Sequence, residues 1–158
     1  MSSGANSLGG EMHETAEPRV RTKHADLSLA EVGDLLPGTG QVMARVSHLW
    51  GTCWYAAHGG NWDLASFYFR RTRSELRALV LTRPKYSEQL RHFEAEGLEP
   101  VGRALAGRDL SSFKEAFEDA VEQANGFHVE TGYPYIRWRL PERSPEMGLD
   151  LGPPPDAG

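Results

Sequence analysis

The stretch CWYAAHGGNWDLASFY, residues 53–68, joins two helix-forming segments through a short break. Apolar residues on both sides of the break recur every three or four positions, which is the pattern of a helix that buries one face. Gly59 and Gly60 favour the end of the first helix, and Asn61 is a suitable N-cap for the second. The stretch therefore predicts a pair of helices joined by a tight turn.

The same periodicity continues outward from this turn and predicts four helices. We expect them at residues 40–58, 61–81, 85–106 and 109–129. Gly97 and Pro100 are expected to kink the third helix, because proline cannot donate a backbone hydrogen bond. Ser112 and Glu115 have the spacing of a capping box near the start of the fourth. Short connections and no strand-like segment predict an all-α fold, an antiparallel four-helix bundle.

The two ends of the chain differ in composition from this central part. The segment LSLAEVGDLL, residues 27–36, predicts a short helix with a capping box formed by Ser28 and Glu31. The residues before it contain few large apolar side chains, and prolines recur from Pro141 onward. We predict a flexible arm at 1–26, a four-helix-bundle domain at 27–140 and an extended tail at 141–158.

Composition and charge limit the classes of function. The chain has 158 residues, 39% of them hydrophobic, and a net charge of -5, which favours one soluble globular domain without affinity for nucleic acid. It has no apolar run long enough for a membrane span and no secretory signal pattern, so we expect a cytoplasmic protein. The single cysteine, Cys53, excludes an internal disulfide and is expected to be a buried small hydrophobe.

A second pattern lies near the end of the fourth predicted helix. The residues ANGFH at 124–128, followed by ETGYPYI at 130–136, have the layout of a C-x-x-C-H haem segment in which both cysteines are replaced. Residues 53–68 are similar to the pattern L-W-F-A-x-x-x-N-W-x-L-A-x-Y. With both motifs, about residues 42–145 resemble the cytochrome c-prime-like four-helix-bundle proteins.

This resemblance implies a former haem site. In that family the two cysteines form thioethers to haem and the histidine is the proximal ligand. The resemblance places Ala124 and Phe127 at the cysteine positions and His128 at the histidine position. Covalent haem is thus excluded, and no cofactor is expected, although non-covalent haem bound through His128 remains an alternative.

A haem-free relative must either collapse the cavity or fill it with another ligand. His128 lies three helical turns after Phe117 on the apolar stripe, so we expect its side chain to point inward. Tyr133 and Tyr135 are further candidates for a polar contact. Aromatic residues are candidates for the cavity wall, although such a set is also typical of plain core: Trp50, Trp54, Tyr55, Phe67, Phe69, Phe93 and Phe127.

Three classes of function remain open. The first is a protein that binds a small, largely apolar molecule near His128. The second is a structural or interaction subunit that forms a homodimer through the first two helices or joins a larger enzyme. The third is an enzyme in which His128 acts as a general base.

A metal site is a weaker alternative. Histidines on three predicted helices could converge on one ion with a carboxylate as a partner. The candidates are His48, His58, His92, His128, Glu75 and Glu94. No E-x-x-H pair supports this arrangement, so we expect no metal ligand set. The basic cluster RRTR at 70–73 is expected to be a solvated helix face.

Overall fold

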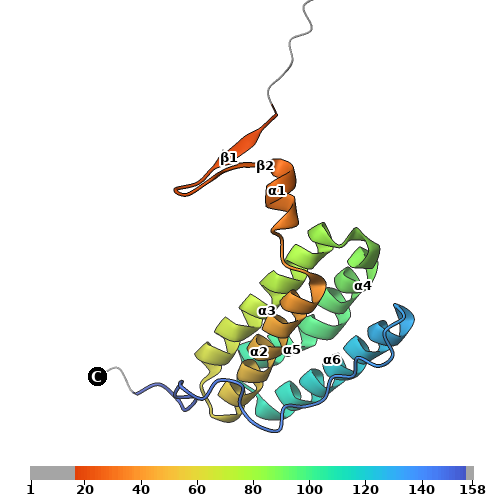
Figure 1. Cartoon of the computed structure of the whole chain (residues 1–158). Helices are drawn as coiled ribbons and strands as arrows, with labels where there is room; N and C mark the ends of the chain where they lie inside the picture. The colour runs from red at the N-terminus through yellow and green to blue at the C-terminus, as the bar shows by residue number, and fades with distance from the viewer. Residues whose placement is uncertain (1–16, 156–158) are drawn as a thin grey trace, which may run out of the picture. The chain divides into compact units, whose positions relative to one another are not determined.

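The computed structural model describes residues 17–155, which belong to two compact units that divide between Pro37 and Gly38 (Figure 1). These residues are mostly helical. In chain order the elements are β1 (Arg19–Arg21), β2 (Asp26–Ser28), α1 (Leu29–Asp34), α2 (Thr39–His58), α3 (Trp62–Thr82), η1 (Pro84–Tyr86), α4 (Ser87–His92), η2 (Phe93–Leu98), α5 (Glu99–Gly107) and α6 (Leu110–Glu130).

The first unit contains a hairpin where the sequence predicts a flexible arm. Strands β1 and β2 pair antiparallel, with Val20 opposite Leu27. The Thr22 hydroxyl closes the turn by accepting a hydrogen bond from the backbone N–H of Ala25. This hairpin was not predicted, because three-residue strands are too short to give a periodic signal. The earlier part of the predicted arm, residues 1–16, lies outside the described residues.

Helix α1 has the predicted capping box. The Ser28 hydroxyl accepts a hydrogen bond from the Glu31 N–H, and the Glu31 carboxylate accepts one from the Ser28 N–H. The short helix at this position is confirmed. It belongs to the first unit, however, whereas the predicted bundle domain began at residue 27.

The turn between α2 and α3 forms as predicted. Helix α2 ends at His58, and Gly60 has a φ of 81°, a left-handed conformation that glycine adopts without strain. Asn61 caps α3 by accepting a hydrogen bond from the N–H of Leu64 at 3.1 Å. Both helix boundaries lie within a residue of the prediction.

The third predicted helix is interrupted near Gly97 and Pro100, as expected, but by a π-helix. It divides into η1, α4, η2 and α5, of which η2 is a π-helix. Pro100 lies in the first turn of α5 directly after η2, and without an N–H it cannot continue the backbone hydrogen bonds of the preceding turn. Gly97 lies within η2, and a Cβ there would be 2.7 Å from the Phe93 ring. The close approach of this ring explains the glycine.

Helix α6 begins at Leu110 with a different cap from the predicted one. The Asp109 carboxylate accepts a hydrogen bond from the Ser112 N–H at 2.7 Å. Ser112 therefore lies inside the first turn, and the predicted capping box with Glu115 is wrong. The interaction with the helix N-terminus holds the pKa of Asp109 below its usual value.

Helices α2, α3, α5 and α6 enclose the core of the second unit. Helix α2 contacts α3 and α6, and α5 contacts the same two helices. The Trp50 ring stacks on Phe117 with 4.0 Å between ring centroids, and Phe113 is fully buried beside them. Cys53 is also fully buried, as predicted, and burial raises the pKa of its thiol. No described helix is long and apolar enough to span a membrane.

The chain after α6 returns along the helices without regular secondary structure (Figure 1). The Tyr55 hydroxyl donates a hydrogen bond to the Pro141 carbonyl at 3.0 Å. Further along, Pro145 lies so close to Gly51 that a Cβ there would be 3.1 Å from its ring. The described part of the predicted tail therefore packs against α2 at Pro141 and Pro145.

Candidate ligand-binding site

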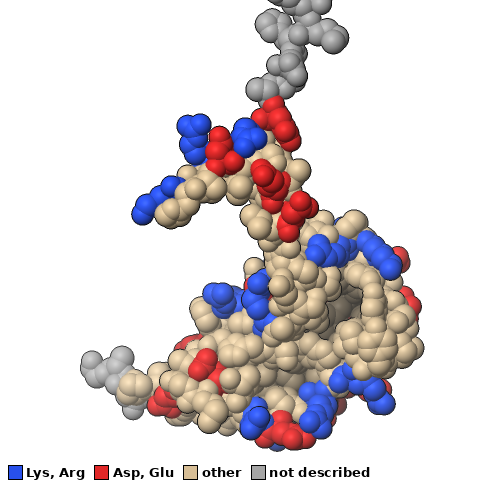
Figure 2. Space-filling view, viewed as in Figure 1, with Lys and Arg blue, Asp and Glu red and all other residues tan. Residues whose placement is uncertain are grey.

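The second unit contains a cavity of about 320 Å³. It lies between the first turns of α2, the last turns of α3 and α6, helix α4, and the segment that follows α6. The space-filling view shows a recess on this face of the molecule (Figure 2). Its apolar wall is formed by Met43, Leu76, Leu79, Leu90, Phe93, Ala124, Phe127, Ile136 and Trp138. Its volume falls in the range of small-molecule sites.

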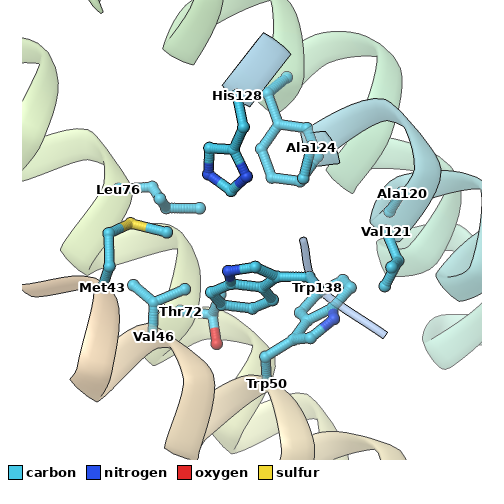
Figure 3. A pocket seen from close by; sticks show the side chains of 11 residues that line it. Met43, Val46, Trp50, Thr72, Leu76, Ala120, Val121, Ala124, His128 and Trp138 are labelled. Atoms are coloured by element: carbon cyan, nitrogen blue, oxygen red, sulfur yellow. The ribbon is translucent and has the colours of Figure 1, made fainter. Parts of the chain in front are cut away.

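A smaller chamber of about 30 Å³ continues from this cavity into the core. The two spaces share several lining residues, and Figure 3 shows the side chains around the inner one. Val46, Trp50 and Thr72 line only the inner chamber. The Thr72 hydroxyl donates to the backbone carbonyl of Tyr68, so this deep wall presents little unpaired polarity. The inner end of the site is therefore apolar.

The last turns of α6 supply one side of the site. Ala124, Phe127, His128 and Thr131 are spaced three or four residues apart, so they lie on the same helix face. The Thr131 hydroxyl donates a hydrogen bond to the Phe127 carbonyl at 2.7 Å. The ANGFH stretch thus places three of its five side chains on the cavity wall.

His128 is half-buried and has a defined tautomer. Its Nδ1 lies 3.0 Å from the Ile136 carbonyl oxygen. Because a carbonyl oxygen only accepts hydrogen bonds, the Nδ1 atom carries the proton, and Nε2 of the neutral ring keeps a lone pair. Burial lowers the pKa of His128, which favours the neutral ring at pH 7.

Asn125 of α6 holds the segment after α6, which forms another wall of the site. Its side-chain amide donates to the Trp138 carbonyl at 2.8 Å, and its carbonyl oxygen accepts from the Trp138 N–H at 2.7 Å. These two bonds hold the backbone of Trp138 as a neighbouring strand would. The Trp138 ring reaches into the space between Val46 and Trp50 on one side and His128 on the other (Figure 3).

Hydrogen-bonded side chains also lie on the cavity wall. The hydroxyls of Tyr86 and Tyr133 are 3.1 Å apart. This hydrogen bond lowers the pKa of Tyr86 and raises that of Tyr133. The Gln89 amide donates to Glu130 at 3.1 Å, and the Arg83 guanidinium donates to Thr39. The first two contacts join η1 and α4 to the end of α6 and the segment beyond it.

Four of the seven predicted ligand-binding residues lie on this cavity: His128, Phe127, Phe93 and Tyr133. The structure places the other three elsewhere. Trp54 packs in the core, with its ring centroid 4.7 Å from that of Phe117. Tyr55 bonds to the tail through its hydroxyl. Phe67 is 44% exposed, with the Arg71 guanidinium over its ring.

The helical stripe explains why these three predictions differ from the structure. Trp54 has the periodicity of a core residue, and the cavity occupies only one end of the helices. The same holds for Phe69, which is buried under Arg73, while Tyr135 is 76% exposed. Trp50 does contact the inner chamber. Sequence periodicity thus identifies which face of a helix is buried, but it does not show where along that face a cavity lies.

Sequence reasoning missed the wall residues Ile136 and Trp138, and it missed Asn125, which holds Trp138 in place. Asn125 belongs to ANGFH, and because asparagine is unfavourable inside a helix, its presence there is a signal that the side chain has another role. The segment 133–138 has no periodic pattern, so its return across the cavity could not be predicted. The apolar residues of α2 and α3 carried no sign that they would face a void.

The histidines and carboxylates weighed as a metal site do not converge. His58 bonds to the Trp54 carbonyl, and His92 packs edge-on against Phe127. Glu75 pairs with Arg45, while Glu94 pairs with Arg73 and Arg77. Over residues 17–155, no group of three His, Cys, Asp or Glu side chains could hold a metal ion. Arg73, from the basic RRTR cluster, is thus occupied within the fold.

No family model, curated protein or solved structure matches this chain. The resemblance to cytochrome c-prime-like proteins therefore stays a prediction from the two sequence motifs. The function is accordingly inferred from the cavity and its wall.

Proposed function

We propose that the second unit is an antiparallel four-helix bundle that binds a small, largely apolar molecule in the cavity beside His128. One observation carries this proposal: a cavity of about 320 Å³ with an apolar wall, which continues into the core. Well-packed interiors leave few voids larger than a water molecule. A space of this size at the end of a bundle is typical of a ligand site.

A titration with an apolar fluorophore such as anilinonaphthalene sulfonate tests this function. Ala124 lies on the wall of both spaces, so Ala124→Phe should fill part of the site and weaken binding at least tenfold. Ala78 is exposed on α3 outside the cavity, so Ala78→Phe is the matched control and should bind as the wild type does. Equal binding by both variants would contradict the proposal.

The histidine separates a binding role from a structural one. If the site binds ligand, His128→Ala should weaken binding while lowering the free energy of unfolding by only about 0.5 to 1.5 kcal/mol, the worth of one hydrogen bond. Loss of stability with unchanged binding would instead make His128 a core residue.

Non-covalent haem is the second candidate. The observation that favours it is the Nδ1 hydrogen bond of His128 to a carbonyl, which is common in metal-ligating histidines. The residues nevertheless fit haem poorly, because Phe127 occupies the wall next to His128 and the volume is near the lower end of the range for small-molecule sites. Titration with haem distinguishes the two, since axial ligation gives a shifted Soret band that His128→Ala abolishes.

We also propose that the protein is cytoplasmic and forms a homodimer through α2 and α3. Phe67 and Leu81 on α3 are 44% and 83% exposed and would supply apolar surface for this contact. Sedimentation at high protein concentration should give about twice the chain mass of 17.5 kDa. A mass of one chain would contradict the homodimer, and the proposed ligand binding would then be that of a monomer.

A further inference from the structure

The cavity wall contains a nitrogen lone pair without a partner. Nδ1 of His128 is engaged by the Ile136 carbonyl, and in the part of the chain that the structure describes Nε2 has no hydrogen-bond partner. The imidazole ring lies between Leu76 and Ala124 at the edge of the inner chamber (Figure 3). An unpaired acceptor beside an apolar space is unfavourable unless a ligand or water satisfies it.

Gln89, a second residue of the cavity wall, also has a hydrogen-bond acceptor without a partner. The Gln89 amide nitrogen donates to the Glu130 carboxylate, which can only accept, so the orientation of the amide is fixed. Its oxygen, Oε1, is buried and has no partner among the described residues. The tyrosine pair at 86 and 133 and the Thr131 hydroxyl, in contrast, have partners within the protein. Both unpartnered atoms are thus acceptors.

We propose that the ligand is a neutral ring compound with one hydroxyl or N–H group, and that this group donates a hydrogen bond to Nε2 of His128. The inference rests on the proposed function and specifies its ligand class. The apolar body of the ligand fills the space bounded by Leu76, Phe93 and Trp138, where aromatic side chains favour a flat ring. A charged ligand is disfavoured around His128, because the inner chamber is lined mainly by apolar side chains.

A matched pair of probes tests this class on the full chain. The probes are 2-naphthol, which has one donor, and 2-methoxynaphthalene, which has the same ring without it. Calorimetric titration at pH 7.5 should give about tenfold tighter binding of 2-naphthol, the effect of one hydrogen bond. His128→Phe should remove the preference, so that both probes bind equally. His24→Phe, at an exposed histidine of the first unit, should keep it.

The outcomes separate the ligand class from the proposed function. Equal binding of both probes to the wild type would overturn the donor requirement and leave the cavity as an apolar site. Binding of neither probe would overturn the proposed function and this inference with it. If His128→Phe does not fold, nitrogen NMR of the wild type decides: 2-naphthol should shift the Nε2 resonance, and an unshifted resonance in the bound state would contradict the inference.

Discussion

Asn125 and Trp138 are joined by two hydrogen bonds between one side-chain amide and one backbone residue, at 2.8 and 2.7 Å. Asn125 belongs to α6, whereas Trp138 belongs to the irregular segment that crosses the cavity. The pair therefore connects the two walls that meet at the inner chamber.

Asn125→Ala should release this segment. The change removes both hydrogen bonds and leaves the backbone groups of Trp138 without these partners, so we expect the free energy of unfolding to fall by about 1 to 3 kcal/mol. Urea unfolding measures this loss. Tryptophan emission should shift to longer wavelength as the Trp138 ring becomes more exposed. A stability loss without any spectral shift would mean that the ring stays in place without the pair.

Gly97→Ala should disturb the π-helix. A Cβ at this position would lie 2.7 Å from the Phe93 ring and 2.8 Å from the Gln123 side chain, so one of them must move. We expect a loss of about 1 to 3 kcal/mol by thermal or urea unfolding, as in other overpacked sites. Because Phe93 lines the cavity, binding of an apolar probe should change as well.

Gly126→Ala provides the matched control. Gly126 lies within α6, and a Cβ there would meet nothing within 4 Å. Alanine is the better helix former, so this variant should be more stable than the wild type by about 0.5 to 1 kcal/mol. Destabilisation by Gly126→Ala would show that the glycine in ANGFH has a role beyond the helix.

Stability should depend on the protonation of His128. Its pKa is lowered in the folded protein by burial, so the unfolded chain binds a proton first as the pH falls below about 6.5. Stability is therefore full above that pH and decreases as the pH falls to the folded pKa. The other titratable side chains on the same wall are Arg83, Tyr86 and Tyr133.

Urea unfolding of the wild type and His128→Gln over about pH 5 to 7.5 checks this dependence. Other histidines contribute equally to both proteins and cancel in the difference. The wild type should lose more stability than the variant on acidification. Parallel curves would contradict the proposed burial of the imidazole.

Gly59→Ala should detach the tail from α2. A Cβ at this position would lie 2.1 Å from the backbone oxygen of Leu151, a contact that only movement of the tail can relieve. The helices themselves are not affected, so circular dichroism should be unchanged. Limited proteolysis should cut the residues after 141 faster than in the wild type, and an unchanged rate would show that the tail accommodates the methyl group.

The helices could be predicted from the sequence because each has a periodic apolar face and a local end signal. Gly59, Gly60 and Asn61 act within a few residues of where they lie, and the boundaries of α2 and α3 match the prediction. The hairpin at residues 19–28 and the π-helix at 93–98 could not be predicted, because both depend on backbone pairings that leave no repeating pattern.

The site was predictable only in part for a related reason. His128 and Phe127 lie on a helix whose inward face can be read from spacing. The lining by Met43, Leu76 and Leu79 depends on where the packed helices diverge, and that is a property of the assembled tertiary structure. The contribution of Trp138 depends on the path of a segment without periodicity, which only its partner Asn125 explains.

The path of residues 133–138 sets the order in which the site can be made. Ribosomes synthesise a chain from its N-terminus, so the helices that bear Met43, Leu76 and Phe93 are synthesised before Trp138. At that stage the cavity lacks the side that Ile136 and Trp138 supply, and Nδ1 of His128 has not formed its hydrogen bond to the Ile136 carbonyl. The cavity is therefore completed late in synthesis, after the residues of the helices around it have been made.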